Sequence, residues 1–225
     1  MVLSQDAITN SPYVILNAAM TVDGKIATAT GDSKISSFQD LKRVHRLRAS
    51  VGGILVGVRT IIADNPSLTL RYARGKKPVR IIADSNARTP PNARVIKVDP
   101  EVKTYICVSE NASSERIESL ESAGAEILVC GKEQVDLSEM MRILKSKSID
   151  RILLEGGGKL NWSMLSNGLV DEVSVALSPL VIGGERAITL ADGEGVRLVK
   201  EGIKLSLKKT SRYGQDLVLF YRVSR

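Results

Sequence analysis

A carboxylate and three glycines stand where a buried strand is expected to meet a helix. Residues 151–164 read RILLEGGGKLNWSM: a short apolar run, then Glu155, then Gly156, Gly157 and Gly158. The apolar run predicts a strand, and the residues from Lys159 onward predict a helix. N–H groups at a helix N-terminus have no intrahelical partner, and glycine lets a ligand approach them closely. This order predicts a phosphate-binding turn, with a tight turn that binds nothing as the structural alternative.

Polar residues and glycines also follow the other predicted strands. They are Asn17 to Lys25, Thr60 and Asp64, Asp84 and Ser85, Gly131 and Lys132, and Gly183 and Gly184. In an open α/β sheet, ligands bind outside the carboxyl ends of the strands, so we expect these groups to gather at one edge. Their glycines, hydroxyls, acids and basic groups suit a phosphorylated nucleotide cofactor.

Other kinds of active site lack their residues. The single histidine, His45, falls in the middle of a predicted helix, and we interpret it as a helix-surface residue rather than a base. Serine–histidine–acid catalysis is therefore not supported, and no G-x-x-x-x-G-K-[ST] loop for phosphoryl transfer is present. With two cysteines and no C-x-x-C pair, no metal site is expected. A reductase fits best, because its cofactor carries the reaction and the protein mainly orients two ligands.

Composition indicates a cytoplasmic protein with one sizeable core. The chain has 225 residues, 43% of them hydrophobic. No apolar run approaches the roughly 18 residues needed to cross a bilayer, and residues 1–11 resemble a loose leader without signal-peptide features. Cys107 and Cys130 lie in apolar runs, which predicts small buried hydrophobes in a reducing compartment rather than a disulfide.

The net charge of +7 suits either nucleic acid or a phosphorylated small molecule. The basic residues are dispersed along the chain, and aromatic residues make up only 4% of it, too few for a base-stacking platform. We therefore expect a phosphorylated small molecule as the partner, and neither nucleic acid nor a membrane.

Strand-like and helix-like segments alternate along most of the chain. Strands are predicted at residues 13–19, 25–29, 53–58, 78–84, 103–108, 125–130 and 152–154, and helices at 38–51, 115–122, from 136 and at 159–165. This alternation predicts a single α/β domain over residues 1–225, with a mostly parallel sheet and helices on both faces. Period-2 alternation at 171–177 and 203–221, with a turn near Tyr213 and Gly214, predicts a C-terminal antiparallel hairpin at the sheet edge.

The helix at 38–51 is expected to be amphipathic. Its inward side is assigned to Leu41, Val44, Leu47 and Val51, and its other sides to Lys42, Arg43, Arg46 and Arg48. Ser37 with Asp40 resembles a capping box, as does Asp136 with Glu139 at a later helix.

Six segments, in this order, resemble the reductases of riboflavin biosynthesis. They are AMTVDGKIAT (19–28), GDSKISS (31–37), VGVRTIIADNPSLTLR (56–71), PVRIIADS (78–85), LLEGGGKLNWSML (153–165) and SPLVIGGERA (178–187). The resemblance implies a dihydrofolate-reductase-like fold, a homodimer, and reduction of the ribosyl group of a 5-phosphoribosylaminopyrimidine to ribityl with NADPH. The zinc-deaminase pattern of the bifunctional bacterial members is missing, so the chain is similar to the free-standing archaeal type.

The resemblance also assigns site residues. It assigns NADPH to Ala19, Thr60, Asp64, Ser85, Gly156, Gly157, Gly158 and Lys159, with Gly131 added from its place after a strand, and the substrate to Ser33, Arg48, Leu68, Arg71 and Glu155. Arginine suits a sugar phosphate because guanidinium offers paired donors to phosphate oxygens. Structural alternatives are a solvated helix face for Arg48, plain core for Leu68, and helix capping for Thr60 and Asp64.

Lys25 and Glu155 are the expected catalytic residues. Lys25 is expected to assist proton movement or hold the ribose hydroxyls, and Glu155 to stabilise positive charge on an imine nitrogen or bind sugar hydroxyls. The alternatives are an exposed turn lysine and a helix-dipole partner, and Asp23 is interpreted as a turn-forming residue. Arg59, Arg88 and Lys132 remain candidates for reading the cofactor's 2′-phosphate, so NADH stays open as the cofactor.

Other functions are kept as alternatives. They are reduction of the deaminated pyrimidinedione, reduction of a pterin such as dihydrofolate, and a non-enzymatic nucleotide-binding domain. The paired arginines favour a phosphorylated substrate over a pterin.

Overall fold

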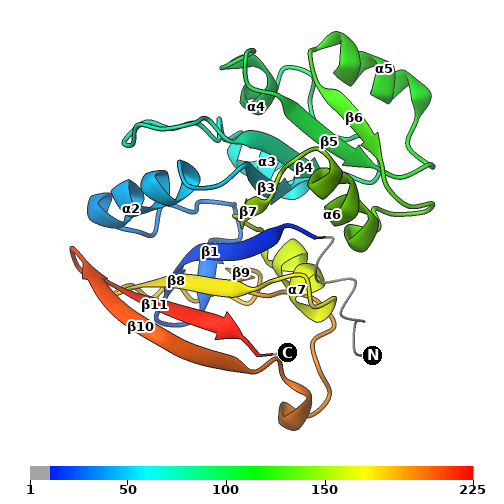
Figure 1. Cartoon of the computed structure of the whole chain (residues 1–225). Helices are drawn as coiled ribbons and strands as arrows, with labels where there is room; N and C mark the ends of the chain where they lie inside the picture. Colours follow the sequence, from blue (N-terminus) through cyan, green and yellow to red (C-terminus); the bar gives the residue numbers. More distant parts are fainter. Residues whose placement is uncertain (1–10, 225) are drawn as a thin grey trace.

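A nine-stranded sheet runs through the whole protein (Figure 1). The computed structural model describes residues 11–224, so the expected leader lies outside the described residues except for Ser11. The strands are β1 (Tyr13–Thr21), β2 (Lys25–Ala27), β3 (Gly53–Gly57), β4 (Val79–Ala83), β5 (Thr104–Val108), β6 (Glu126–Val129), β7 (Arg151–Leu154), β8 (Glu172–Ser178), β9 (Ile188–Thr189), β10 (Leu205–Tyr213) and β11 (Asp216–Val223). β2 and β9 form a separate antiparallel pair.

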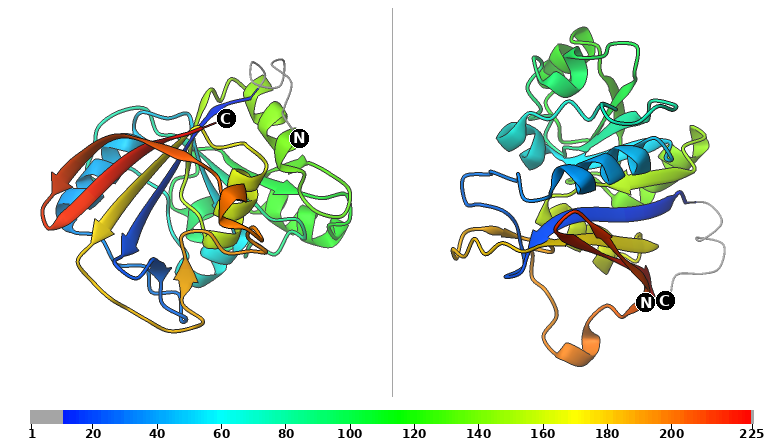
Figure 2. Two further views of the ribbon diagram at one scale, coloured as in Figure 1. Left: turned by 90° about the horizontal axis from the view of Figure 1, so that it is seen from below. Right: turned by 90° about the vertical axis from the view of Figure 1, so that its left-hand side faces the viewer.

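The order in the large sheet is β10-β11-β8-β1-β7-β3-β4-β5-β6. Every neighbouring pair from β8 to β6 is parallel, whereas β11 runs antiparallel to β8 and to β10. The β10–β11 hairpin turns between Tyr213 and Asp216 and forms one edge of the sheet (Figure 2). The predicted mostly parallel sheet and its C-terminal hairpin are confirmed. Residues 171–177, expected among the antiparallel strands, form β8, which lies inside the sheet and is antiparallel only to β11.

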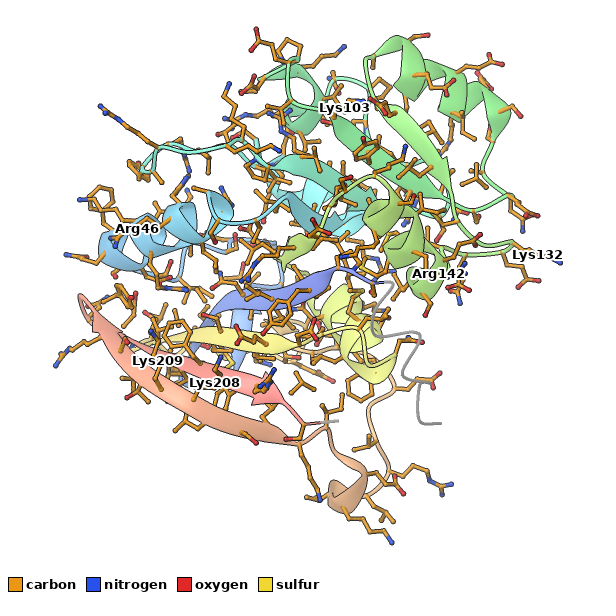
Figure 3. All side chains as sticks on the ribbon, viewed as in Figure 1. Arg46, Lys103, Lys132, Arg142, Lys208 and Lys209 are labelled. Atoms are coloured by element: carbon orange, nitrogen blue, oxygen red, sulfur yellow. The ribbon has the colours of Figure 1, made fainter. Side chains whose placement is uncertain are left out.

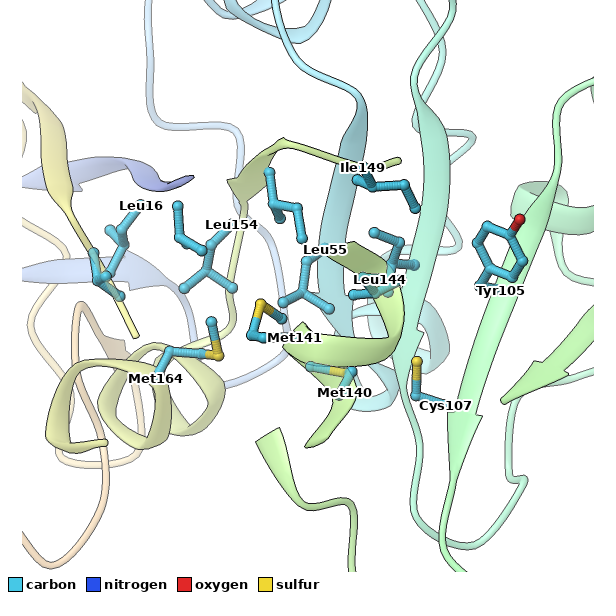
Figure 4. Close-up of a cluster of buried hydrophobic side chains, with 14 of the residues drawn as sticks. Leu16, Leu55, Tyr105, Cys107, Met140, Met141, Leu144, Ile149, Leu154 and Met164 are labelled. Atoms are coloured by element: carbon cyan, nitrogen blue, oxygen red, sulfur yellow. The ribbon is translucent and has the colours of Figure 1, made fainter. Parts of the chain in front are cut away.

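Helices cover both faces of this sheet. They are α2 (Phe38–Arg48), α3 (Val58–Asp64), α4 (Arg94–Lys97), α5 (Ser114–Ser122), α6 (Leu137–Ser146) and α7 (Gly158–Ser166), with a 3₁₀ turn at Val199–Glu201. One core packs beneath α6 and α7 and contains Leu16, Leu55, Leu154, Met141 and Met164 (Figure 4). The other, beneath α3, α4 and α5, contains Ile54, Ile61, Ile82, Ile96 and Leu120. Cys107 and Cys130 are fully buried free thiols in the first core, as expected.

Serine and aspartate caps fix the starts of α2 and α6. The Ser37 Oγ accepts a hydrogen bond from the Asp40 N–H at 3.3 Å, and the Asp136 carboxylate accepts one from the Glu139 N–H at 2.9 Å. The predicted caps are therefore present, but the acids of the boxes bind elsewhere. Asp40 pairs with Arg43, and Glu139 accepts from the Gly131 N–H.

The face of α2 that packs on the sheet is polar, which corrects the sequence-based assignment of Arg43 to an outer side. The Arg43 guanidinium is 6% exposed and donates to Asp40 at 2.6 Å, to Ser174 at 3.1 Å and to Asn17 at 2.8 Å. Asn17 and Ser174 belong to β1 and β8, so Arg43 attaches α2 to two central strands. Hydrophobic spacing could not reveal this because the buried residues of the helix are polar or charged.

Positive charge is spread over the described surface (Figure 3). The labelled cations Arg46, Lys103, Lys132, Arg142 and Lys208 come from separate segments of the chain. Within residues 11–224, no helix is long and apolar enough to cross a membrane.

We expect Arg43→Met to lower the free energy of unfolding by about 3–5 kcal/mol, because it leaves the buried Asp40 carboxylate without its counter-charge. The double variant Arg43→Met/Asp40→Asn should recover part of that loss. Urea denaturation measures both, with Arg46→Met on the exposed side of α2 as the matched control. A loss in Arg43→Met no larger than in the control would contradict this role.

Candidate active site

The glycine turn after β7 is held against the neighbouring strand β3. Glu155 N–H donates to the Leu55 carbonyl at 2.9 Å, and the Gly156 carbonyl accepts from Gly57 N–H at 2.8 Å. Gly156 has φ of +90°, a conformation that a residue with a side chain rarely adopts. The predicted strand, acid and glycine turn are thus present at the carboxyl end of a central strand.

Helix α7 begins at Gly158, directly after this turn. Gly157 N–H donates to the Thr60 hydroxyl at 3.0 Å, so α3 positions the turn from the other side. Among residues 11–224, no side-chain hydrogen bond caps the first turn of α7, and Lys159 there is exposed. Thr60 and Asp64 lie within α3, whose caps are Gly57 and Asn65, so their interpretation as capping residues is wrong.

A cleft of about 850 Å³ opens beside α7. Its lining includes Ser85 after β4, the loop from Gly131 to Glu139, and Leu160 and Ser163 of α7. Such a volume is typical of sites that bind nucleotide-sized molecules. The loop turns at Gly131, where φ is +82° and an added Cβ would lie 2.5 Å from the Gln134 carbonyl oxygen. The residues present therefore fit a nucleotide cofactor.

The remaining predicted cofactor residues lie around the same edge. The Ser85 hydroxyl accepts from Val135 N–H at 3.0 Å and so shapes the rim of the cleft. The Ser33 hydroxyl donates to the Asp64 carboxylate at 3.2 Å, which links the loop before α2 to the end of α3. Ala19 lies in β1, in register with Ala176 of β8.

The Arg48 and Glu155 side chains form a two-point ion pair. Arg48 Nε and Nη2 donate to the two carboxylate oxygens at 2.7 and 2.6 Å, and the side chains are 14% and 12% exposed. Burial disfavours the charged form of Arg48, but the carboxylate more than offsets this and raises the pKa of the guanidinium. Arg48 is therefore not on a solvated helix face, and Glu155 is more than a helix-dipole partner.

The loop between α3 and β4 carries Leu68 and Arg71 past this ion pair. Arg48 Nη1 donates to the Thr69 carbonyl at 3.1 Å. Leu68 is 4% exposed and packs in the core beneath α3, so the core interpretation of its side chain is confirmed. Arg71 is exposed, which leaves its guanidinium accessible to a ligand.

His45 lies at the centre of these groups and not on the helix surface, which corrects the sequence-based interpretation. Its side chain is fully buried, and Nδ1 accepts a hydrogen bond from Arg71 N–H at 3.0 Å. Burial, with the positive charges of Arg48 and Arg71, lowers the pKa of His45 to about 4. One sequence signal was available: Leu41, His45 and Arg48 recur at the i, i+4, i+7 spacing of a single helix face.

Lys25 lies at the start of β2, in register with Thr189 of β9. Its ammonium forms no ion pair in the described part of the chain, and within that part Glu155 is paired with Arg48 instead. Asp23 lies in the turn between β1 and β2, as expected, and its carboxylate accepts hydrogen bonds from the N–H groups of Ile182 and Gly183 at 3.2 and 2.7 Å. A hydrogen bond with the Thr21 side chain, together with those two bonds, lowers the pKa of Asp23 to about 2.

The candidates for reading a 2′-phosphate differ in position. Lys132 is exposed and lines the cleft. Arg88 lies 3.8 Å from the Asp84 carboxylate, and Arg59 is exposed on α3. Only Lys132 of these three is among the cleft residues.

A mostly parallel sheet with a nucleotide-sized cleft at its carboxyl edge and an antiparallel C-terminal hairpin defines a dihydrofolate-reductase-like protein. A family model described as the RibD C-terminal domain matches residues 12–219, and the chain belongs to this family. The reductase character of the family implies a nicotinamide cofactor.

Individual relatives extend this result. The chain is 50% identical to the 2,5-diamino-6-ribosylamino-4(3H)-pyrimidinone 5′-phosphate reductase of Methanothermobacter thermautotrophicus, over 94% of this chain and 98% of that protein. It is 39% identical to the Aquifex aeolicus protein of the same name, over 94% and 96% of the two chains. The structure of Acinetobacter baumannii RibD aligns with a TM-score of 0.81 at 26% identity, over 96% of this chain but 59% of that one.

The pKa of His45 predicts how stability depends on pH. Between its ordinary value of 6.5 and about 4, the unfolded chain takes up a proton that folded His45 does not, so stability falls as pH falls through this range. Above this range His45 is neutral in both states and contributes no pH dependence.

The difference in free energy of unfolding between wild type and His45→Asn should therefore shrink by about 3 kcal/mol from pH 6.5 to 4. Urea denaturation at a series of pH values measures it. Wild type and His45→Asn contain the same carboxylates, so the titration of these carboxylates largely cancels in the difference between the two free energies of unfolding. Parallel curves for the two proteins would show that His45 titrates normally.

Proposed function

We propose that this protein is a 2,5-diamino-6-ribosylamino-4(3H)-pyrimidinone 5′-phosphate reductase of riboflavin biosynthesis. In this reaction, the ribosyl group of 2,5-diamino-6-(5-phosphoribosylamino)pyrimidin-4(3H)-one is reduced to the ribityl form with NADPH. The observation that carries the proposal is the buried Arg48–Glu155 pair at the end of β7, with exposed Arg71 on one side and the glycine turn on the other. The relatives of this name, which match over nearly their whole length, support it.

The cofactor side of the site consists mainly of backbone. The Gly156–Gly158 turn, the uncapped first turn of α7 and Lys159 suit the pyrophosphate, because unpaired N–H groups at a helix N-terminus favour negative charge. The cleft lined by Ser85 and Gly131 suits the adenosine half. Exposed Lys132 in this cleft supports NADPH over NADH, with its ammonium as a partner for the 2′-phosphate.

The substrate side of the site consists of charged side chains. Arg71 offers an unobstructed guanidinium to the 5′-phosphate. Arg48 uses three of its five N–H groups on Glu155 and Thr69, so two remain for the substrate. Ser33 and the backbone at Leu68 complete this side.

Reduction requires opening of the ribose ring, in which the C1′–ring oxygen bond breaks, the ring oxygen takes a proton and a positively charged iminium forms between C1′ and the neighbouring nitrogen. Hydride then adds at C1′, so one proton and one hydride are consumed. A bound nicotinamide cofactor supplies the hydride. Glu155 stabilises positive charge on that nitrogen, since each of its oxygens keeps a lone pair beyond the bond from Arg48. Lys25, without an ion-pair partner among residues 11–224, assists the proton at the ring oxygen or holds the ribose hydroxyls.

The deaminated pyrimidine is the second candidate substrate. The chain is 40% identical to RibD of Actinobacillus pleuropneumoniae over 96% of this chain and 58% of that protein. A solved Thermotoga maritima relative at 25% identity is titled a 5-amino-6-(5-phosphoribosylamino)uracil reductase as well as a deaminase.

We expect NADPH to be oxidised with the diaminopyrimidinone ribosyl 5′-phosphate, more slowly with its deaminated counterpart, and not with dihydrofolate. NADPH absorbance follows the reaction, and mass spectrometry identifies the ribityl product. A preference for the deaminated compound would replace the first substrate by the second. No oxidation with either phosphoribosyl compound would refute the reductase proposal.

Glu155→Gln and Lys25→Met should each lower turnover by about a hundredfold or more, because each removes a group that acts on the reacting atoms. Arg142→Gln, an exposed substitution on α6, is the control. Fluorescence titration with NADPH should give wild-type affinity for all three variants. Normal turnover in either site variant would remove that residue from the catalytic assignment.

Residues 1–225 are proposed to form one domain, which assembles as a cytoplasmic homodimer. The continuous nine-stranded sheet supports the first part. Two buried free thiols, Cys107 in β5 and Cys130 directly after the neighbouring β6, support a reducing compartment. Light scattering after size-exclusion chromatography gives the mass of the assembly.

A further inference from the structure

The loop between α3 and β4 has a conformation that must be held in place from outside. Asn65 and Leu68 both have positive φ, +42° and +48°, in the left-handed region that costs energy for residues other than glycine. The side chain of Asn65 stabilises the conformation of this residue, because its Oδ1 accepts a hydrogen bond from the Arg94 N–H at 2.8 Å. The rest of the loop, up to Arg71, needs other partners.

Helix α2 holds this loop at two backbone atoms. Arg48 Nη1 donates to the Thr69 carbonyl at 3.1 Å, and His45 Nδ1 accepts from Arg71 N–H at 3.0 Å. His45 and Arg48 are three residues apart, so both side chains leave the same face of the helix. The bond from Arg48 therefore fixes the loop at the Thr69 carbonyl, and the bond to His45 fixes it at the Arg71 amide.

Aromatic contacts continue this attachment past Arg71. The Tyr72 ring packs edge-to-face on His45, with centroids 5.0 Å apart, and on Phe38 at 5.2 Å. The Arg71 guanidinium lies 5.7 Å from the centroid of the Tyr72 ring. The imidazole thus supports both the backbone of Arg71 and the ring beneath its side chain.

We propose that His45 is a positioning residue for substrate binding: its Nδ1 accepts from the amide of Arg71 and so holds the guanidinium of Arg71 where the substrate's phosphate binds. This proposal rests on the proposed function, in which Arg71 is the phosphate ligand. His45 does not touch the substrate itself, because its ring is fully buried.

The electrostatics of the pocket keep this acceptor available. A protonated imidazole has two N–H groups and cannot accept a bond from an amide. The groups that face His45 include the cations of Arg48 and Arg71 and the carboxylate of Glu155, with Tyr72 as the aromatic neighbour. Burial and the two cations outweigh the carboxylate and keep the ring neutral at physiological pH.

Three substitutions of His45 test the hydrogen-bond acceptor at Nδ1 separately from the size and polarity of the side chain. The Asn Oδ1 occupies the place of Nδ1, whereas the amide of Gln reaches the place of Nε2, and Leu keeps volume without polarity. We expect His45→Gln and His45→Leu to raise KM for the phosphoribosyl substrate roughly tenfold with kcat changed much less, because they loosen binding and leave the Arg71 amide without its acceptor. His45→Asn should stay within about threefold of wild type.

Two controls accompany these variants. Arg46→Gln, on the exposed side of α2, should match wild type in KM and kcat. NADPH affinity should be unchanged in all variants, since His45 lies on the substrate side. Equal KM values for wild type, His45→Asn and His45→Gln would overturn the proposal, as would a rise in NADPH dissociation constant equal to the rise in KM.

A second measurement needs no turnover. The chain has one histidine, so in untagged protein the imidazole nitrogens give unambiguous two-bond ¹H–¹⁵N signals. We expect an unprotonated Nδ1 and a proton on Nε2 at neutral pH. A proton on Nδ1 would overturn the proposal, even if His45→Leu or His45→Gln failed to fold. Failure of the function itself is distinguishable, because wild type would then oxidise NADPH with neither phosphoribosyl compound.

Discussion

The ion pair between Arg48 and Glu155 lies between the proposed cofactor side and the proposed substrate side of the site. It connects the C-terminal end of α2 with the residue that follows β7, across 107 positions in the chain. Both side chains are largely buried, and removing two charges from water is costly unless geometry and further hydrogen bonds compensate. Here two hydrogen bonds join the guanidinium to the carboxylate, and a third runs from Arg48 to the Thr69 carbonyl. The backbone of Glu155 is held as well, because its amide donates a hydrogen bond to Leu55 of β3. A shift of α2, of the loop at Thr69 or of β3 would therefore disturb the same pair.

Helix α2 is suited to this role because its inner face is held by charge and hydrogen bonding. At its start Arg43 binds Asp40 and reaches β1 and β8 through Asn17 and Ser174. At its end His45 and Arg48 hold the loop that carries Arg71. Directional bonds fix the rotation of a helix about its axis more strictly than apolar contacts, which tolerate sliding. The same rotation that buries Arg43 thus aims Arg48 at Glu155.

The local pattern of apolar, polar and turn residues was sufficient to predict most of the fold. Apolar runs followed by turn residues located β1 and β3 to β7 within a few residues, and period-2 alternation located β8 and the hairpin at Tyr213. The parallel pairing of β8 with β1 was not predicted, because alternation along a strand does not specify the direction of its neighbour. The inner face of α2 could not be predicted in this way, since composition assigns Asp40, Arg43 and His45 to water. Their burial depends on partners such as Asn17 and Ser174 that lie far away in sequence. The short helix α4 was missed because its four residues show no complete hydrophobic period.

Part of the candidate site could likewise be predicted from contiguous residues, whereas the rest depends on contacts between residues far apart in the chain. The glycine turn was found from sequence because strand, acid and glycines are contiguous. The family resemblance selected Arg48, Arg71 and Glu155, but only the structure shows that Arg48 is committed to Glu155 and that His45 supports Arg71. Glu155 is paired with Arg48, whereas the turn beside it consists of glycines and the backbone N–H groups at the start of α7, followed by the exposed Lys159. Backbone dipoles at a helix N-terminus favour negative charge, so in the proposed function this turn can hold a phosphate of the cofactor while Glu155 stays paired with Arg48.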